Sequence, residues 1–280
     1  MKKFFLILIF CSLFVSGCAG AGNPFKKELS LKGVRPVNIT METVEEEYES
    51  YANTLYGWGL KKKVNAPPEV PENIQNLIAT YGGIYLDQTP RTLYLTFDEG
   101  YENGYTAKIL DVLKENNVTA AFFVTGPYLE KETELVKRMF DEGHVVGNHT
   151  VNHPSMPRLS GTEAVAKEIT ELNEMCREKY GQTMHFFRPP RGEYSERTLK
   201  ISQDLGYTNV FWSFAYKDWE VNNQKGTDYA YEQIKKGVHD GAVLLLHAVS
   251  KDNAEILDRV IKDLKSEGYR FKSLEDFGKQ

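Results

Sequence analysis

Short apolar stretches alternate with amphipathic helical patterns along most of the chain, from residue 89 onward. The apolar stretches predict strands at residues 93–97, 120–124, 144–146, 185–188, 209–214, 242–246 and 270–271. The patterns between them predict helices at residues 105–116, 131–142, 162–180, 195–205, 228–239 and 253–267. This alternation is typical of parallel strands with helices outside them. Seven strands are too many for a small open sheet and one fewer than a standard α/β barrel contains.

The N-terminal end predicts an exported protein. Lys2 and Lys3 precede a nearly unbroken apolar run at residues 4–15, which is too short to favour a membrane-spanning helix. The sequence Val15-Ser16-Gly17-Cys18 resembles a bacterial lipobox. Residues 1–17 are therefore predicted to be a lipoprotein signal peptide, and the lipid on Cys18 would anchor the protein to the outer face of a membrane. The alternative is an ordinary cleaved signal peptide followed by a chance cysteine.

Net charge limits the class of partner, and the sequence pattern separates two segments after the signal peptide. Loss of the two lysines in residues 1–17 changes the formal net charge from −5 to −7. An acidic chain argues against nucleic acid as a partner. Residues 18–88 are interpreted as a tether and an N-terminal extension, because their pattern is irregular and rich in proline near its end. Residues 89–277 are predicted to form a single catalytic domain.

Ionisable side chains follow five of the predicted strands, at the same end of each. In parallel α/β barrels the loops after the strands converge on one face, where catalysis takes place. We therefore expect these side chains to share one site, although a structural ion pair is the alternative for any one of them. The residues concerned are Asp98 and Glu99, His149 and His153, Arg188, Asp218, and His247.

The first two groups indicate a metal-assisted hydrolase. Adjacent acids such as Asp98 and Glu99 point to different sides of an extended backbone, so one can bind a metal while the other handles a proton. His149 and His153 are four residues apart, a spacing from which two imidazoles can reach one ion.

The five groups together resemble the motifs of the polysaccharide deacetylases, carbohydrate esterase family 4. The matching stretches are Thr96-Phe97-Asp98-Glu99, His149-Thr150-Val151-Asn152-His153, Arg188-Pro189-Pro190-Arg191-Gly192, Asp218-Trp219 and Leu244-Leu245-Leu246-His247. Two positions depart from the family pattern: Glu99 stands where aspartate is usual, and Ala215 replaces the first acid of the fourth motif. The resemblance covers residues 89–277 and implies an irregular (β/α)7-type barrel.

The resemblance also implies a role for each residue. His149, His153 and Glu99 would hold a divalent ion, Zn²⁺ by the preference of imidazole. Asp98 would be the general base, held by a bidentate contact from Arg188. His247 would be the general acid, oriented by Asp218. The acetyl pocket and the sugar would be contacted by Trp219, Leu246, Arg191 and Tyr128.

Glu99 complicates the metal site. Its carboxylate extends one C–C bond, about 1.5 Å, further from the backbone than that of aspartate. Metal–ligand distances tolerate only about ±0.2 Å. The ion must therefore shift, a water must intervene, or Glu99 does not bind the ion.

Three further stretches resemble the spore-cortex deacetylases that form muramic δ-lactam: residues 96–106, 222–226 and 249–255. The function expected from this likeness is hydrolysis of the acetamide of N-acetylmuramic acid in peptidoglycan strands. One alternative is an N-acetylglucosamine deacetylase that acts on peptidoglycan or chitin-like oligomers. An alternative of another class is a catalytically weak glycan-binding module, suggested by Glu99 and Ala215.

Overall fold

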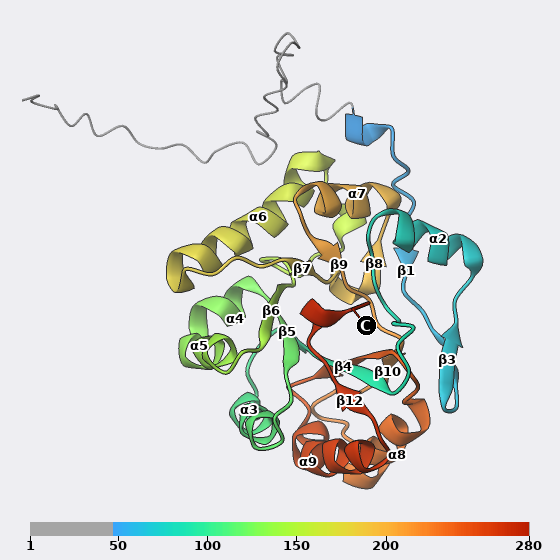
Figure 1. Ribbon diagram of the computed structural model, residues 1–280. Coiled ribbons are helices and arrows are strands. Elements are labelled where there is room, and N and C mark those ends of the chain that lie inside the picture. The colour runs from blue at the N-terminus through green and yellow to red at the C-terminus, as the bar shows by residue number, and fades with distance from the viewer. Residues whose placement is uncertain (1–46, 280) are drawn as a thin grey trace, which may run out of the picture. The chain divides into compact units, whose positions relative to one another are not determined.

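The fold is built on a curled sheet of parallel strands (Figure 1). The computed structural model describes residues 47–279. The strand order is β10-β11-β4-β5-β6-β7-β9, with β12 also paired to β4, and every one of these pairs is parallel. The strands are β4 (Thr92–Glu99), β5 (Ala120–Val124), β6 (Val145–Asn148), β7 (Phe186–Phe187), β9 (Thr208–Asn209), β10 (Phe214–Ala215), β11 (Ala242–His247) and β12 (Arg270–Phe271). The irregular barrel predicted from the sequence is confirmed.

Helices surround the strands (Figure 1). They are α2 (Glu72–Thr80), α3 (Thr106–Glu115), α4 (Gly126–Lys131), α5 (Thr133–Asp141), α6 (Gly161–Tyr180), α7 (Glu196–Asp204), α8 (Thr227–Gly237) and α9 (Lys251–Ser266), with the short 3-10 helices η1 (Met156–Arg158), η2 (Pro190–Gly192) and η3 (Leu274–Asp276). Within residues 47–279, no helix is both long enough and apolar enough to cross a membrane.

The strand predicted at residues 209–214 is divided in two. Its first part is β9, which pairs with β7, and its second part is β10, which pairs with β11. These partners lie near opposite edges of the sheet. The chain therefore crosses the open side of the barrel between Asn209 and Phe214, and it cannot be one continuous strand.

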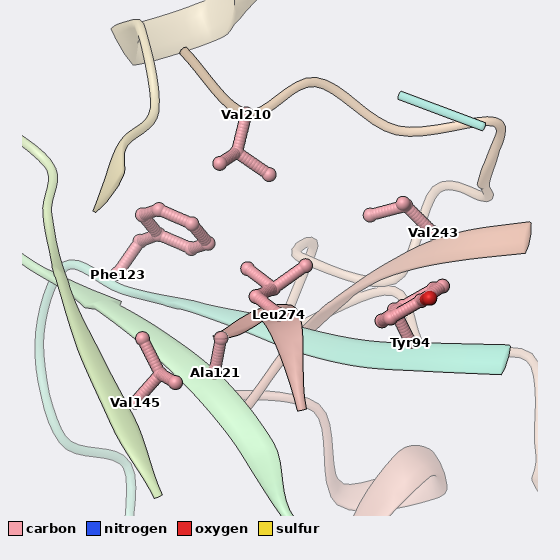
Figure 2. Close-up of a cluster of buried hydrophobic side chains, with 7 residues drawn as sticks. All are labelled: Tyr94, Ala121, Phe123, Val145, Val210, Val243 and Leu274. Carbon is pink, nitrogen blue, oxygen red and sulfur yellow. The ribbon is translucent and has the colours of Figure 1, made fainter. Parts of the chain in front are cut away.

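The barrel interior is filled by apolar side chains (Figure 2). Because side chains alternate along a strand, every second residue of β4, β5 and β11 points inward. Leu274 of η3 lies among these side chains. The buried members of this cluster are Tyr94, Ala121, Phe123, Val145, Val210, Val243 and Leu274.

Residues 47–88 contribute to the wall of the barrel. β1 (Tyr56–Gly57) pairs with β8 (Glu193–Tyr194), and β2 (Lys61–Lys63) forms a hairpin with β3 (Ala66–Glu69). Trp58 is buried among Tyr194 and Phe211. Further along, Ile84 and Leu86 form bridges to Val210 and Ala242, so this segment spans the open side of the sheet. The predicted signal peptide, Cys18 and the first part of the predicted tether lie outside the described residues.

Candidate active site

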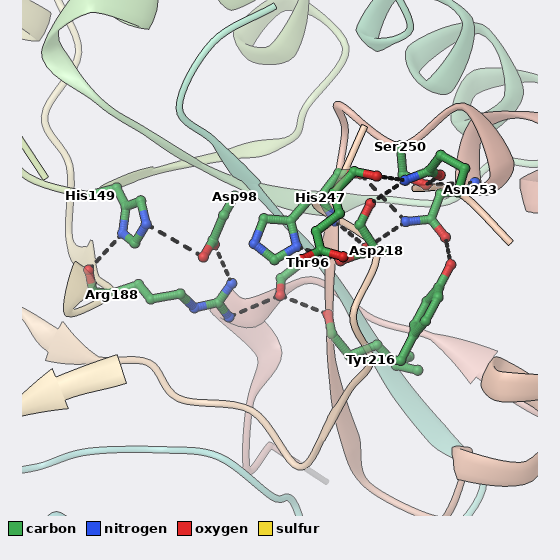
Figure 3. Close-up of polar contacts among 12 residues, drawn as sticks. Thr96, Asp98, His149, Arg188, Tyr216, Asp218, His247, Ser250 and Asn253 are labelled. Carbon is green, nitrogen blue, oxygen red and sulfur yellow. Dashed lines mark hydrogen bonds and ion pairs between the residues drawn. The ribbon is translucent and has the colours of Figure 1, made fainter. Parts of the chain in front are cut away.

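The carboxyl ends of β4 and β11 bring two of the predicted catalytic residues side by side. The two strands are adjacent and parallel, and His247 is the register partner of Asp98. Residues paired in this way project to the same face of a sheet. Figure 3 shows both side chains in one polar cluster with Arg188, His149 and Asp218. The convergence predicted from the strand ends is therefore present in the fold.

Arg188 holds Asp98 from the interior of the barrel. It follows β7, is fully buried, and has its guanidinium carbon 4.1 Å from the centre of the Phe123 ring. Nη1 donates to Oδ1 of Asp98 over 2.7 Å, and Nη2 donates to Oγ1 of Thr96 over 2.9 Å. The predicted bidentate contact is therefore wrong, because Thr96, on the same face of β4, takes the second nitrogen.

The electrostatic setting keeps Asp98 ionised. Burial, the largest single influence, would raise the pKa of its carboxyl group, but the charge and hydrogen bond of Arg188, together with His149 and His247, outweigh burial and hold that pKa below its usual range. Because Arg188 binds only Oδ1 of this carboxylate, the other oxygen, Oδ2, can accept a proton.

The two predicted histidine ligands lie together next to Asp98. Nδ1 of His149 donates to the carbonyl oxygen of Arg188 over 2.8 Å, so its Nε2 carries a lone pair when the ring is neutral. That nitrogen lies 3.4 Å from Oδ2 of Asp98. The rings of His149 and His153 have centres 4.8 Å apart. Burial lowers the pKa of both rings, to about 4 for His153, so both are neutral near pH 7.

His247 is held by Asp218, as the resemblance implied. Its Nδ1 lies 2.7 Å from Oδ1 of Asp218, and its backbone N–H donates to Oδ2 over 2.8 Å. Burial lowers the pKa of His247, but the charge and hydrogen bond of Asp218, together with the charge of Asp98, more than compensate, so the pKa is raised above 6.5. Trp219 has its ring centre 5.3 Å from that of His247 and is half exposed.

Comparisons with known proteins agree with this geometry. The sequence model of the polysaccharide deacetylase family matches residues 86–210. Peptidoglycan-N-acetylmuramic acid deacetylase PdaA of Bacillus subtilis is 48% identical over 231 residues, which cover 81% of this chain and 88% of PdaA. The chain belongs to the polysaccharide deacetylase family.

Solved structures of family members have the same fold. The structure of Bacillus subtilis PdaA, a family 4 carbohydrate esterase, superimposes with a TM-score of 0.78 at 47% identity and covers 81% of this chain and 97% of that one. A family 4 carbohydrate esterase from Bacillus anthracis gives a TM-score of 0.69 at 44% identity with the same coverage.

A further sequence relative is named for a different sugar. This peptidoglycan-N-acetylglucosamine deacetylase of Bacillus cereus is 35% identical over 184 residues, which cover 64% of this chain and 66% of that protein.

Glu99 does not join the two histidines. β4 remains a regular strand through residue 99, so Glu99 points to the opposite face from Asp98. Its Oε1 accepts a 3.5 Å hydrogen bond from Thr106, and its Oε2 has no hydrogen-bond partner among residues 47–279. Burial and the nearby charge of Glu102 raise the pKa of Glu99 well above its usual range, which favours the neutral acid.

Of the four residues predicted to contact the substrate, two are buried away from the site surface and two are exposed. Leu246 points outward from β11 and lies among Leu257 and Ile261 of α9, away from the site. Tyr128 is buried, with its hydroxyl 3.4 Å from Glu102, so its ring is not at the surface of the site. Trp219 and Arg191 are exposed, and Arg191 is near enough to His153 for its charge to contribute to lowering the pKa of that ring.

In the part of the chain that the structure describes, the two histidines do not share a metal site with Glu99. The deacetylases of this family are metal-dependent. His149 and His153 suit an ion, because they are neutral and because Nε2 of His149 faces a carboxylate oxygen with no proton between them. Glu99 does not fit. Within residues 47–279, no group of three or more histidine, cysteine, aspartate or glutamate side chains is arranged to hold an ion.

Sequence reasoning gave no role to two residues that complete the cluster. Thr96 shares Arg188 with Asp98, and Asn253 donates to Oδ2 of Asp218 over 2.6 Å. Alternation along β4 could have identified Thr96, since it lies two residues before Asp98. Asn253 lies in the 249–255 stretch noted above, but alternation does not indicate a role for it, because it reaches the site from the first turn of α9.

Proposed function

We propose that this protein removes the acetyl group from N-acetylmuramic acid in peptidoglycan. The observation that carries the proposal is the 48% identity to a relative named as a deacetylase of that sugar, over 88% of its length. The cluster formed by Asp98, Arg188, Asp218 and His247 supports hydrolysis of an amide, because it contains both a base and an acid on one face.

The chemistry follows from the two ends of the amide bond. An acetamide is a poor electrophile and its amine is a poor leaving group, so hydrolysis needs an activated water and a proton for the nitrogen. Oδ2 of Asp98 takes a proton from the attacking water, and Arg188 keeps that carboxylate in place. His247, with Nδ1 bonded to Asp218, donates its Nε2 proton to the departing amine. Acetate leaves and the sugar retains a free amine.

Arg191 and Trp219 support muramic acid as the sugar. Muramic acid differs from glucosamine by a lactyl group that ends in a carboxylate, and an arginine is suited to bind one. Arg191 is exposed beside His153, and exposed Trp219 can stack on a sugar ring. The freed amine and the lactyl carboxylate then lie on the same residue, where their condensation gives the δ-lactam of spore cortex.

The experiment that tests the substrate combines genetics with purified protein. Deletion of the gene is expected to remove muramic δ-lactam from cortex muropeptides analysed by mass spectrometry, and the wild-type gene, but not one encoding Asp98→Asn, restores it. Unchanged lactam content would contradict the assignment. In the purified protein, Arg191→Gln is expected to raise KM for muramyl glycan more than KM for chito-oligosaccharides.

The relative from Bacillus cereus supports a second candidate, deacetylation of N-acetylglucosamine. The same residues would act in the same roles on this sugar. Acetate release from chito-oligosaccharides at a rate above that from muramyl glycan, with no effect of Arg191→Gln, would favour it.

We propose His149 and His153 as the residues that hold the family's divalent ion, and Zn²⁺ as the ion, since imidazole suits this metal. When bound, it would polarise the acetyl carbonyl. Metal analysis tests the ligands. Glu99→Gln is expected to keep metal content and activity close to those of the wild type, whereas His149→Gln loses both. Loss of metal in Glu99→Gln would show that Glu99 is a ligand.

The location remains a proposal from the sequence. Export, with a lipid anchor at Cys18, would place the site where peptidoglycan is found. Fractionation of the full-length protein and of Cys18→Ala tests it: release of this variant from the membrane fraction is expected, and an unchanged distribution would contradict the anchor.

A further inference from the structure

Two stretches far apart in the sequence, residues 216–226 and 249–253, are joined by side-chain hydrogen bonds behind the Asp218–His247 pair (Figure 3). Ser250 donates to Oε1 of Gln224 over 2.7 Å, and Nε2 of Gln224 donates to the carbonyl oxygen of Asp218 over 2.8 Å. Ser250 also accepts from the backbone N–H of Asn253 and so begins α9. The start of α9 is thereby fixed against the chain that carries Asp218.

The carboxylate of Asp218 is enclosed and fully bonded. Its side chain has no exposed surface. Oδ1 is bonded to Nδ1 of His247, while Oδ2 accepts from the backbone N–H of His247 and from Nδ2 of Asn253. Two of these bonds go to residue 247 itself. The bond from Asn253 is the one that ties the carboxylate to a different element, α9.

The side-chain amide of Asn253 can serve this purpose in only one orientation. Its NH₂ group must face Asp218, because a carboxylate can only accept and an amide oxygen there would be repelled. The hydroxyl of Tyr216 bonds to Oδ1 of Asn253 and so holds the amide oxygen on the other side. Because Tyr216 and Asn253 are both buried, water does not compete for these hydrogen bonds.

We propose that Asn253, oriented by the hydroxyl of Tyr216, is a positioning residue that holds the Asp218 carboxylate against Nδ1 of His247. This inference rests on the role proposed above for His247. With Nδ1 occupied by Asp218, the ring presents Nε2 to the substrate amine. A carboxylate free to rotate would leave the ring without a fixed orientation, and proton donation would suffer while glycan binding would not.

The test compares Asn253→Leu, which keeps the approximate size of the side chain, with Asn116→Leu. Asn116 also donates its amide to a carboxylate on α9, Asp258, over 2.9 Å, but it lies at the C-terminal end of α3, away from the site. Asn253→Leu is expected to lower kcat about 10- to 100-fold, as loss of supporting hydrogen bonds does in other sites, with a much smaller change in KM. Asn116→Leu is expected to keep the wild-type kcat.

A second readout needs no substrate. The proton between Nδ1 of His247 and Asp218 should give a downfield ¹H NMR resonance, assigned by its absence in His247→Gln. We expect Asn253→Leu to shift or broaden it and Tyr216→Phe to do so less. If Asn253→Leu does not fold, kcat and the downfield resonance of Tyr216→Phe test the role of Asn253 instead. Wild-type kcat and an unchanged resonance would overturn the inference. A wild-type protein that releases no acetate would defeat the proposed function, while the resonance would still decide the role of Asn253.

Discussion

Asp98 serves both the chemistry and the stability of the site. In the proposed reaction it accepts a proton through one oxygen, and its other oxygen neutralises Arg188, whose side chain is fully buried. A buried charge that loses its partner is strongly destabilising, because its desolvation is no longer compensated by an ion pair. The proposed general base is therefore also part of a buried ion pair.

Replacement of Asp98 by asparagine is expected to affect both properties. Loss of the general base should lower kcat about 10²- to 10⁴-fold. The unpaired charge of Arg188 should lower the free energy of unfolding by about 3–5 kcal/mol. Acetate release and denaturant unfolding measure the two effects. A stable variant without activity would show that Arg188 finds another partner, whereas an active variant would show that Asp98 is not the base.

The pH dependence of activity should reflect His247. As general acid it must be protonated, and its pKa is raised above 6.5 by Asp218. Activity should therefore persist at neutral pH and fall as the pH rises through that raised pKa. In Asp218→Asn the pKa of His247 falls, so the alkaline limb of kcat/KM should move to lower pH. An alkaline limb that does not move would contradict the pairing.

The sequence could place residues at strand ends, and alternation put Asp98 and Glu99 on different sides, but it could not tell whether β4 and β11 stay regular to their last residues. Asp98 and His247 were correctly expected to share a site, because the ends of parallel strands meet. Glu99 and Leu246 were misjudged for a common reason: each lies one residue from a site residue on a strand that stays regular, so alternation turns it outward. Only the actual length of β4 and β11 decides this.

At the scale of elements, close packing of β5 against β6 supports the arginine. Gly147 of β6 is the register partner of Phe123 of β5, and a Cβ atom on Gly147 would lie 2.5 Å from the Phe123 ring. That ring in turn packs against the guanidinium of Arg188. The absence of a side chain at position 147 thus allows the aromatic ring to support the catalytic cluster.

Substitution of Gly147 by alanine should disturb this packing. The added methyl group would displace Phe123, which we expect to cost about 1–3 kcal/mol in unfolding free energy and to lower kcat by moving Arg188. Gly57→Ala is the matched control, because a Cβ atom there meets nothing within 4 Å. Denaturant unfolding and acetate release measure both variants. Equal stability of the two would show that Phe123 moves aside at no cost.

At the scale of the whole molecule, the barrel extends further toward the N-terminus than the sequence pattern indicated. The strand and helix alternation begins at residue 89, and this start set the predicted boundary. Yet Trp58 packs in the core, donates through Nε1 to the carbonyl oxygen of Trp212 over 2.8 Å, and donates through its backbone N–H to Gly192. Such irregular segments carry no periodicity, so the sequence could not identify them as barrel wall.

Two truncated chains test this boundary. A chain that starts at residue 47 retains these contacts and should fold with a cooperative thermal transition. One that starts at residue 89 lacks Trp58 and the bridges of Ile84 and Leu86, so it exposes apolar core and should fail to fold or aggregate. Circular dichroism and size-exclusion chromatography compare them. A folded, active chain from residue 89 would show that the segment is dispensable.

The position of β4 in the sheet has a consequence for timing. Its neighbours are β5, which follows it closely in the chain, and β11 and β12, which come almost last. Since a domain generally folds as a unit, the pairing of β4 with β11 that sets Asp98 beside His247 can form only after the last strands have been synthesised. The proposed base and the proposed acid therefore face each other only once these final strands have docked against β4.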